Sequence, residues 1–383
     1  MQLITDNDSL AQACQTFSEH RYITVDTEFL RERTFWPKLC LIQVACPGHE
    51  ALIDPLADGL DLTPFYRLLK NKKITKVMHG CRQDIEIFFK EADIIPTPLV
   101  DTQVMAMVCG FGDAAGYETL VRRVANEKID KGSRFTDWAQ RPLSDKQLTY
   151  ALADVTHLRV IFEKLEAQLL ETKRLHWVKE EMKTLTDRET YRQLPENAWR
   201  RLRMNDKRPH VIGVLMHTAA WREQKAQTQN IPRQRVLKDD TLREIALQGP
   251  QNLEALEKLR SFPKGLSKSS QINGLLDAIK QGRKTKKQDL PDLPQQVDNK
   301  PGIGPLVELL KVLLKHKCEE HDVAPKLIAN VADLERIASD DDPKVKALSG
   351  WRKDIFGKDA LKLKKGQIGL ACMDGEVTII DCA

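Results

Sequence analysis

Residues 22–29 have the sequence YITVDTEF, in which β-branched and aromatic side chains give way to two acids. Such a run is typical of a buried strand. Because side chains alternate between the two faces of a strand, Asp26 and Glu28 point to one face and Thr27 to the other. The stretch therefore predicts a strand that brings two carboxylates to one position.

Two further patterns can supply groups to the same position. An apolar strand at 74–78 and a His79-Gly80 turn precede Asp84, which opens a helical pattern. Tyr150 and Asp154 are four residues apart in a segment of good helix formers, so they lie on one helix face. We expect the strand and the two helix positions to meet in space.

Four acids in one cleft repel each other, and burying them unpaired is costly, so the pattern predicts bound cations. Hard oxygen ligands suit Mg²⁺ or Mn²⁺, and two such ions about 3.5 to 4 Å apart can promote hydrolysis of a phosphodiester. Tyr150 would orient the attacking water. Taken singly, each pattern is more often a solvated or packed surface than a site. Their order along the chain favours the site.

In order and spacing these residues resemble the ribonuclease D family, in the tyrosine-containing branch of the DEDD superfamily of 3′-to-5′ exonucleases. Further blocks carry the likeness, which covers nearly the whole chain: Arg31 to Pro37, Leu41-Ile42-Gln43, Ile53-Asp54-Pro55, His79-Gly80, 99–103 (LVDTQ), Thr136-Asp137-Trp138, Arg141-Pro142-Leu143 and Tyr150 to Val155. The resemblance implies a water-orienting Tyr150 and four metal ligands, Asp26, Glu28, Asp84 and Asp154.

The resemblance also implies an activity. It is hydrolytic removal of nucleoside 5′-monophosphates from RNA 3′ ends, with 3′-extended tRNA precursors as substrates. A DNA-directed exonuclease on the same core is the alternative, because no short motif reports contacts to the 2′-hydroxyl. The intact acids and Tyr150 argue against a third interpretation, a catalytically silent RNA-binding protein. His79 and His157 are interpreted as structural or peripheral, since this branch does not require a catalytic histidine.

Length and composition indicate a protein of several domains. The 383 residues exceed the usual limit of one core, so two or three domains are expected. Apolar runs stay short of the roughly 20 residues that span a membrane, and the N-terminus carries Asp6 and Asp8 instead of a basic leader. The eight cysteines form no Cys-x-x-Cys pair. We expect a cytoplasmic protein with reduced thiols, no zinc module and no obligate protein partner.

Charge is uneven along the chain. Residues 201–300 hold 20 Lys and Arg against 11 Asp and Glu, a net charge of +9, whereas residues 1–200 carry −3 and residues 301–383 carry −1. A basic region beside acidic catalytic residues is expected of a protein that holds a polyanion by its phosphates. A soluble, lysine-rich helical surface is the competing interpretation.

The periodic patterns predict a catalytic domain over 1–170. Strands are expected near 22–29, 39–46, 50–54, 74–78 and 97–101, and helices near 8–19, 63–70, 83–91, 102–109, 116–126 and 144–169. This order predicts an α/β core of the RNase H-like exonuclease type, a mixed sheet with flanking helices. After residue 170 strand signals nearly vanish, and prolines such as Pro195, Pro250, Pro294 and Pro301 separate short helical segments.

Two small all-α domains are expected after a helical connector at 171–207. Residues 208–286 resemble an HRDC domain, which implies an auxiliary nucleic-acid or protein contact surface; Trp221 and Leu242 are predicted to be core residues within it. A basic run is either a solvated linker or an arm that contacts phosphates: Arg283, Lys284, Lys286 and Lys287. Residues 302–366 weakly resemble a second HRDC-like domain. In the tail, 367–383, apolar residues alternate around Asp374-Gly375 as in a hairpin.

Overall fold

A six-stranded mixed sheet forms the centre of the N-terminal half of the protein. The computed structural model describes residues 3–129, 132–133, 136–263, 265–266, 271–291 and 302–382. The strands in spatial order are β1 (Leu3–Ile4), β4 (His49–Ile53), β3 (Lys38–Cys46), β2 (Tyr22–Leu30), β5 (Thr75–Met78) and β6 (Leu99–Asp101). β2 pairs antiparallel with β3 and parallel with β5, so the predicted mixed sheet is confirmed.

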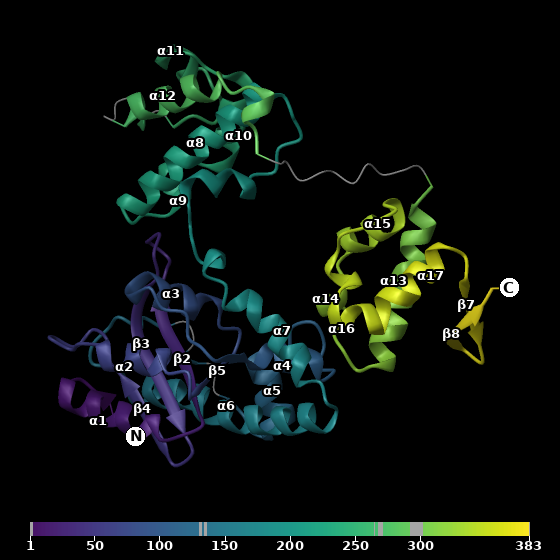
Figure 1. Ribbon diagram of the computed structural model, residues 1–383. Helices are drawn as coiled ribbons and strands as arrows, with labels where there is room; N and C mark the ends of the chain where they lie inside the picture. The colour runs from purple at the N-terminus through teal and green to yellow at the C-terminus, as the bar shows by residue number, and fades with distance from the viewer. Residues whose placement is uncertain are drawn as a thin grey trace.

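Helices flank the sheet (Figure 1): α1 (Asn7–Ser18), α2 (Thr63–Lys70), α3 (Arg82–Ala92), α4 (Thr102–Val108), α5 (Tyr117–Leu120), α6 (Asp145–Glu171) and α7 (Leu175–Leu185). α6 packs across β2 and β3. It begins at a capping box, in which the Ser144 hydroxyl accepts from the Gln147 N–H at 3.3 Å and the Gln147 side chain accepts from the Ser144 N–H at 3.0 Å. The long helix predicted near 144–169 is confirmed.

Two predicted elements differ from the structure. The helix expected over 116–126 is α5 followed by a π-helical turn, Val121–Ala125, which ends where Asn126 adopts a left-handed conformation with φ 60°. The strand expected over 97–101 begins only at Leu99. Pro98 has no N–H to donate to a neighbouring strand, although its carbonyl accepts from the Lys76 N–H at 2.9 Å. The two-residue β1 is too short for a periodic pattern to predict.

The region after the connector is helical and has its own hydrophobic core. The connector itself ends in the 3₁₀ turns Arg188–Thr190 and Pro195–Arg201. The elements after it are α8 (Pro209–Thr228), α9 (Arg233–Val236), α10 (Asp239–Gln248), α11 (Leu253–Glu257), α12 (Ile272–Gly282) and the 3₁₀ turn Lys287–Asp289. α8 and α12 cross so closely that a Cβ built on Gly282 would lie 2.5 Å from the Val214 Cα. Trp221 and Leu242 are buried, as predicted. Pro294 and Pro301 lie outside the described residues.

The C-terminal region is also helical and ends in a hairpin. It contains α13 (Gly304–Glu320), α14 (Pro325–Ile328), α15 (Val331–Ser339), the 3₁₀ turn Lys346–Leu348, α16 (Gly350–Arg352), the π-helical turn Lys353–Gly357, α17 (Lys358–Lys364), β7 (Ile368–Met373) and β8 (Glu376–Asp381). The hairpin turns at Asp374 and Gly375, whose φ angles of 53° and 85° suit a two-residue turn. Between them the described residues confirm an α/β core followed by helical regions.

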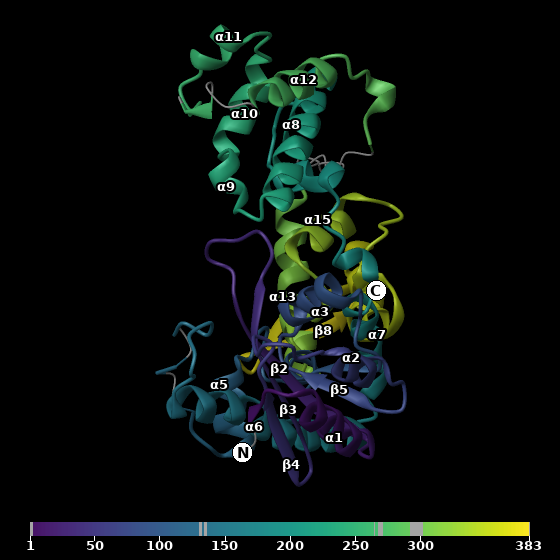
Figure 2. The ribbon, with the colours of Figure 1, turned by 90° about the vertical axis from the view of Figure 1, so that its left-hand side faces the viewer.

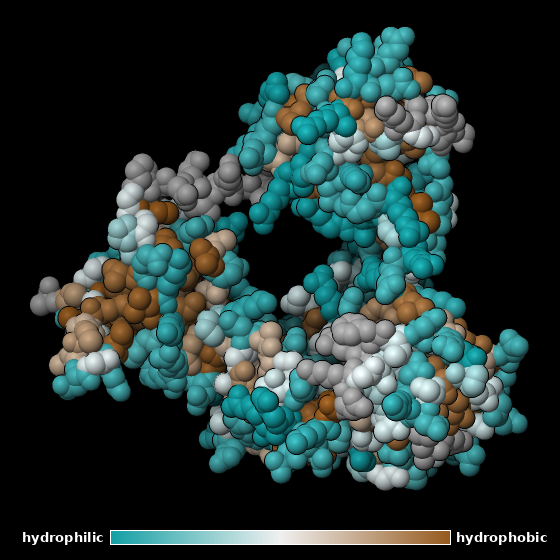
Figure 3. All heavy atoms as spheres, turned by 180° about the vertical axis from the view of Figure 1, so that it is seen from behind, coloured by the Kyte–Doolittle hydropathy of each residue, from teal (hydrophilic) through white to brown (hydrophobic). Residues whose placement is uncertain are grey.

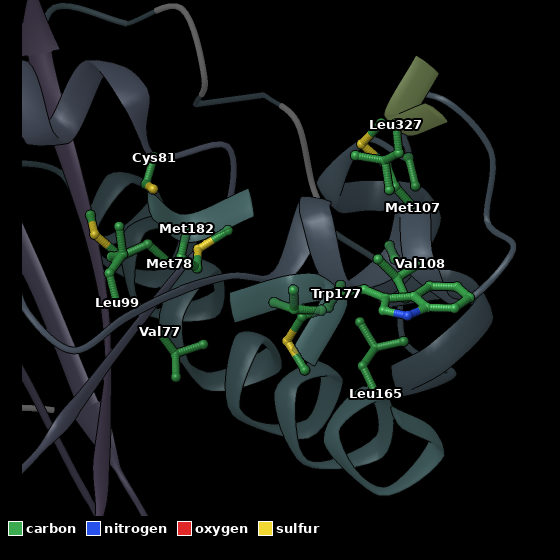
Figure 4. Close-up of a cluster of buried hydrophobic side chains, with 14 of the residues drawn as sticks. Val77, Met78, Cys81, Leu99, Met107, Val108, Leu165, Trp177, Met182 and Leu327 are labelled. Carbon is green, nitrogen blue, oxygen red and sulfur yellow. The ribbon is translucent and has the colours of Figure 1, made fainter. Parts of the chain in front are cut away.

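The C-terminal region docks on the catalytic core through one continuous hydrophobic cluster. Met107 of α4, Trp177 of α7 and Leu327 of α14 belong to this cluster (Figure 4). Trp177 stacks on Trp351, with ring centroids 4.3 Å apart and planes 9° from parallel. Beside the stack, the buried guanidinium of Arg352 bonds to the carboxylates of Glu180 and Glu181. An apolar contact flanked by buried ion pairs therefore fixes this region on α7.

The first helical region, from α8 to the turn Lys287–Asp289, is called the HRDC-like region below. It contacts the catalytic core at another place, the loop between β2 and β3. Figure 2 shows this loop reaching towards α9. The Trp36 N–H donates to the Asn230 side chain at 3.0 Å, and the Arg233 guanidinium lies 4.2 Å from the centroid of the Phe35 ring. Seen from behind in Figure 3, mostly hydrophilic surfaces face the opening between the lobes. The chain thus holds its two helical regions at separate docking points.

All eight cysteines are free thiols, and six of them are buried: Cys14, Cys40, Cys46, Cys81, Cys109 and Cys318. Cys372 and Cys382, in and just after the C-terminal hairpin, are exposed. Burial raises the pKa of Cys14, Cys109 and Cys318 to about 12, so these thiols stay protonated. Among the described residues, we find no helix with the length and apolar composition that crossing a bilayer requires.

Candidate active site

Asp26 and Glu28 lie on β2, one of the two central strands of the sheet, on the face that α6 covers. Thr24, which shares this face, donates its hydroxyl proton to the Val155 carbonyl of α6 at 2.9 Å. Burial, and then the neighbouring carboxylates of Asp84, Asp154 and Glu28, raises the pKa of Asp26 well above its usual range. These interactions bring the four predicted acids into one electrostatic site.

Asp84 reaches the site from the first turn of α3. Only 7 % of the residue is exposed, and its carboxylate accepts a hydrogen bond from the hydroxyl of Thr27. Burial raises the pKa of Asp84 to about 7, an effect that the bond from Thr27 partly offsets. Since Thr27 alternates with Asp26 and Glu28 along β2, Asp84 approaches the cluster from the opposite side of the strand.

Tyr150 and Asp154 lie one turn apart on α6 and line the same cavity, together with Asp26. This cavity has a volume of about 360 Å³, and its other walls come from the α4 and α5 region. The Tyr150 ring lies 6.1 Å from the ring of the buried Trp138, centroid to centroid. The charges of Glu28 and Asp84 act on Asp26, but these two residues do not line the cavity. The phenol and one carboxylate therefore share one helix face, as their spacing predicts.

The donor set matches hard divalent cations in its chemistry, because Mg²⁺ and Mn²⁺ prefer carboxylate oxygens. Burial and neighbouring carboxylates raise the pKa values of Asp26 and Asp84, as expected where acids are gathered in one site. Within the described ranges, however, no three acidic, histidine or cysteine side chains are arranged to hold an ion as they stand.

A carboxylate outside the acid cluster, Asp101, shapes the turn that leads to Asp84. It accepts hydrogen bonds from the N–H groups of Gly80, Cys81 and Gln103 at 2.9, 3.0 and 2.8 Å. His79 lines the cavity, and its Nδ1 lies 2.9 Å from the Thr102 hydroxyl. Burial lowers the pKa of His79, an effect that the nearby Asp101 carboxylate opposes. The geometry gives His79 a hydrogen-bonding role in this turn.

The loop before α6 is fixed by an ion pair between two of the blocks that carry the family resemblance. Arg141 binds Asp54 through two bonds of 2.6 Å and also donates to the carbonyls of Cys40 and Trp138. The Gln147 side chain bonds to the Thr136 hydroxyl at 3.1 Å. These contacts tie the start of α6, and with it Tyr150, to β3 and β4.

Sequence patterns did not single out three polar side chains at the site. Tyr117 lines the cavity and donates to the carbonyls of Ala153 and Asp154 at 3.2 and 2.5 Å. Gln103 also lines it, facing Gly80. Gln43 is opposite Asp26 on β3, is fully buried, and has no hydrogen-bond partner for its amide among the described residues. Gln43 and Gln103 stand within the LIQ and LVDTQ blocks, which are the signals that could have pointed to them.

Comparisons with known proteins agree with this geometry. A family model for a 3′-5′ exonuclease matches residues 1–170, and one for an HRDC domain matches residues 213–279. Ribonuclease D of Nitrobacter hamburgensis is 49 % identical over 381 residues, which cover 100 % of both chains. Ribonuclease D of Jannaschia is 49 % identical over 99 % of each chain. The chain belongs to the ribonuclease D family.

A solved structure supports the same conclusion for the whole architecture. Ribonuclease D of Escherichia coli, described as an exoribonuclease involved in structured RNA processing, superposes with a TM-score of 0.82. It is 28 % identical and covers 95 % of this chain and 98 % of its own. The likeness therefore extends through the helical regions. Membership of this family, with its exonuclease and HRDC domains, makes the protein a 3′-to-5′ exoribonuclease.

Proposed function

We propose that this ribonuclease D family member uses two divalent metal ions to shorten tRNA precursors from their 3′ ends, releasing nucleoside 5′-monophosphates. The observation that carries the proposal is the coupling of four carboxylates around Asp26, beside a cavity that Tyr150 also lines. Two Mg²⁺ or Mn²⁺ ions, when bound, would activate a water molecule and stabilise the leaving 3′ oxygen.

The protein's own groups have separate roles in this proposal. Tyr150 precedes Asp154 by one turn of α6, and its hydroxyl orients the attacking water. Tyr117 holds the same turn of the helix through its bonds to the two carbonyls. The cavity of about 360 Å³ accepts the 3′-terminal nucleotide. The oxygen ligands for the ions come from Asp26, Glu28, Asp84 and Asp154.

RNA as substrate is supported by the family and by the distribution of charge. The net charge of +9 over residues 201–300 offers phosphate contacts away from the acidic site. Eight unpaired thiols suit a reducing compartment, so we place the enzyme in the cytoplasm, acting without an obligate protein partner. The precursors of tRNA that carry 3′ extensions are the substrate class that the family implies.

A timed digestion tests the substrate and the metal requirement together. Wild-type protein is incubated with 3′-extended tRNA and with single-stranded DNA of matched sequence, with Mg²⁺, with Mn²⁺ and with a chelator. We expect stepwise shortening of the tRNA, mononucleotide products and no reaction with the chelator. Faster digestion of DNA would support the DNA-directed alternative instead. Digestion that persists in the chelator would refute the metal-dependent site.

Two substitutions test the assigned residues. Asp26→Asn should abolish turnover, whereas Asp58→Asn, at an exposed position remote from the cavity, should not. Tyr150→Phe keeps the ring but removes the hydroxyl, so kcat should fall about 100-fold or more while stabilisation by Mg²⁺ stays unchanged. Tyr66→Phe on α2 is the control for loss of a phenol. Loss of metal binding in Tyr150→Phe, or an unchanged kcat, would contradict the water-orienting role.

The basic run after α12 is a separate proposal. Its residues are Arg283, Lys284, Lys286 and Lys287, and we propose that they contact RNA phosphates. Arg283 already donates to the Gly249 carbonyl, and the Lys287–Asp289 turn follows. Charge reversal at the four positions should weaken tRNA binding and make it less sensitive to salt. Equal affinity and equal salt dependence would show that this run is a solvated linker.

A further inference from the structure

Two adjoining cavities lie where the catalytic core, the connector and the HRDC-like region meet. Their volumes are about 330 and 420 Å³. Both are lined by Arg31 just after β2, Arg201 of the connector and Arg233 of α9. Because they share these three residues, we treat them as one groove and call it the arginine groove.

The arginine groove is rich in positive charge. Six guanidinium groups line it, against three carboxylates, those of Glu86, Glu223 and Asp239, which leaves a net charge of +3. The arginines are Arg31, Arg82, Arg192, Arg201, Arg222 and Arg233. Among the described residues, Arg82 forms no ion pair, and Arg192 pairs only with the exposed Glu189 outside the groove. The guanidinium groups of Arg82 and Arg192 are therefore available to bind an anion in the groove.

Buried carboxylates hold the arginine side chains in place before any ligand binds. Glu223 has a side chain only 1 % exposed, and it pairs with both Arg201 and Arg233. Glu86 pairs with Arg31 through two bonds of 2.8 and 2.9 Å. Since planar guanidinium groups bind phosphate oxygens in a fixed fork geometry, such preorganised arginines suit phosphate better than flexible lysines would.

The arginine groove begins next to the end of β2, the strand that carries Asp26 and Glu28. A third cavity, of about 490 Å³, shares Thr34 with it and is lined also by Arg33, Lys38 and Asp137. Arg31 directly follows the last residue of β2 and is three residues beyond Glu28, a separation of about 10 Å in extended chain. A single-stranded nucleic acid whose 3′ end lies at the acid site can therefore reach the groove with its next few phosphates.

We propose that the arginine groove binds backbone phosphates of the RNA strand a few nucleotides 5′ of the bond that is cleaved. The proposal rests on the RNA-directed function proposed above and names the surface that holds that RNA. Both the catalytic core and the HRDC-like region contribute guanidinium groups, so a bound strand bridges the two. The HRDC-like region thereby supplies substrate affinity close to the site, independently of the basic run after α12.

The test removes two charges from the groove without disturbing its buried ion pairs. The double variant Arg82→Gln/Arg192→Gln is compared with Arg67→Gln/Arg260→Gln, which loses two exposed arginines outside the groove, one from the catalytic core and one from the HRDC-like region. All proteins carry Asp26→Asn to prevent digestion. Binding of single-stranded RNA 4-mers and 12-mers is measured at several salt concentrations, along with binding of inorganic phosphate to the parent.

Loss of two phosphate contacts makes the negative slope of log affinity against log salt shallower by about 1.4 for a single strand. It also weakens 12-mer binding about 25-fold at 0.1 M salt. The control pair should keep the slope and the affinity gain from 4-mer to 12-mer. Equal 12-mer affinity in both double variants would overturn the proposal. So would tight binding of inorganic phosphate that RNA fails to displace, since the groove would then hold a small anion.

Failure of this proposal is distinguishable from failure of the proposed function. Binding is measured in a protein that does not digest RNA, whereas the function is read from digestion by the wild type. Unchanged RNA binding in the groove variant, alongside normal tRNA shortening by the wild type, refutes the groove alone. Absence of RNA digestion by the wild type refutes the function.

Discussion

The metal-free enzyme should lose stability as pH rises through neutrality, because Asp84 is buried without a cation. The folded pKa of Asp84 is about 7, against the ordinary value of 3.8 expected in the unfolded chain. A raised folded pKa gives stability that is present below the unfolded pKa and is lost as pH rises through the folded pKa. Between pH 5 and pH 8 the loss amounts to about 2.5 kcal/mol, from the two pKa values alone.

The perturbation that isolates this effect is Asp84→Asn. The amide oxygen can still accept the hydrogen bond from Thr27, so the variant removes the charge and keeps the shape. For a domain of this size, about 2.5 kcal/mol corresponds to a fall in Tm of roughly 5 to 10 °C. We expect the wild type to show that fall in a chelator between pH 5 and pH 8, and Asp84→Asn to show less of it.

Differential scanning calorimetry of the full chain measures both proteins at the two pH values. Mg²⁺ at saturating concentration should abolish most of the pH dependence of the wild type, because it binds the charged form of the cluster. Asp58→Asn, at an exposed position, should behave as wild type. An equal fall in Tm in wild type and Asp84→Asn would show that Asp84 is not the group whose charge the fold resists.

Three further substitutions test other features. Gln43→Leu should raise the Tm of the metal-free protein, because it removes a buried amide that costs about 1 to 3 kcal/mol per unpaired group; a lower Tm would reveal a buried partner. Gly282→Ala should destabilise the HRDC-like region by about 1 to 3 kcal/mol, since its Cβ would strike Val214, and calorimetry should show the catalytic transition unmoved. Trp351→Ala should cost about 3 to 5 kcal/mol and detach the C-terminal region, seen as an increased radius by small-angle scattering; an unchanged radius would refute the docking role of the stack on Trp177.

Much of the site was predictable because its groups obey local periodicity. The alternation of side chains along a strand is enough to place Asp26 and Glu28 together. The spacing of four in a helix is enough to place Tyr150 above Asp154. Apolar patterns with the period of a strand (2) or of a helix (3.6) also predict the strands and long helices of the core, including α6. Short-range geometry therefore fixes each pair, and the order of elements brings the pairs together.

The remainder depends on contacts that no local pattern contains. Gln43 faces Asp26 only because β2 and β3 pair in one register, which their sequences do not state. Tyr117 reaches the carbonyl of Asp154 across 37 positions of chain, from a helix that ends in an unpredicted π turn. The arginine groove gathers residues from 31 to 239, so linear charge counts locate positive charge in the helical half but cannot locate the groove.

The distribution of cysteines allows their reactivity to report on the separate regions of the chain. Residues 201–300 contain none, whereas Cys109 of the catalytic core and Cys318 of α13 belong to the single cluster that joins the core to the C-terminal region. A thiol reagent applied to the native protein should modify Cys372 and Cys382 at once and leave the six buried thiols unmodified. If the C-terminal region then separates from the core while the sheet stays folded, Cys109 and Cys318 should become reactive as well. The order in which masses increase in a labelling time course would thus report which lobe separates first, without any introduced probe.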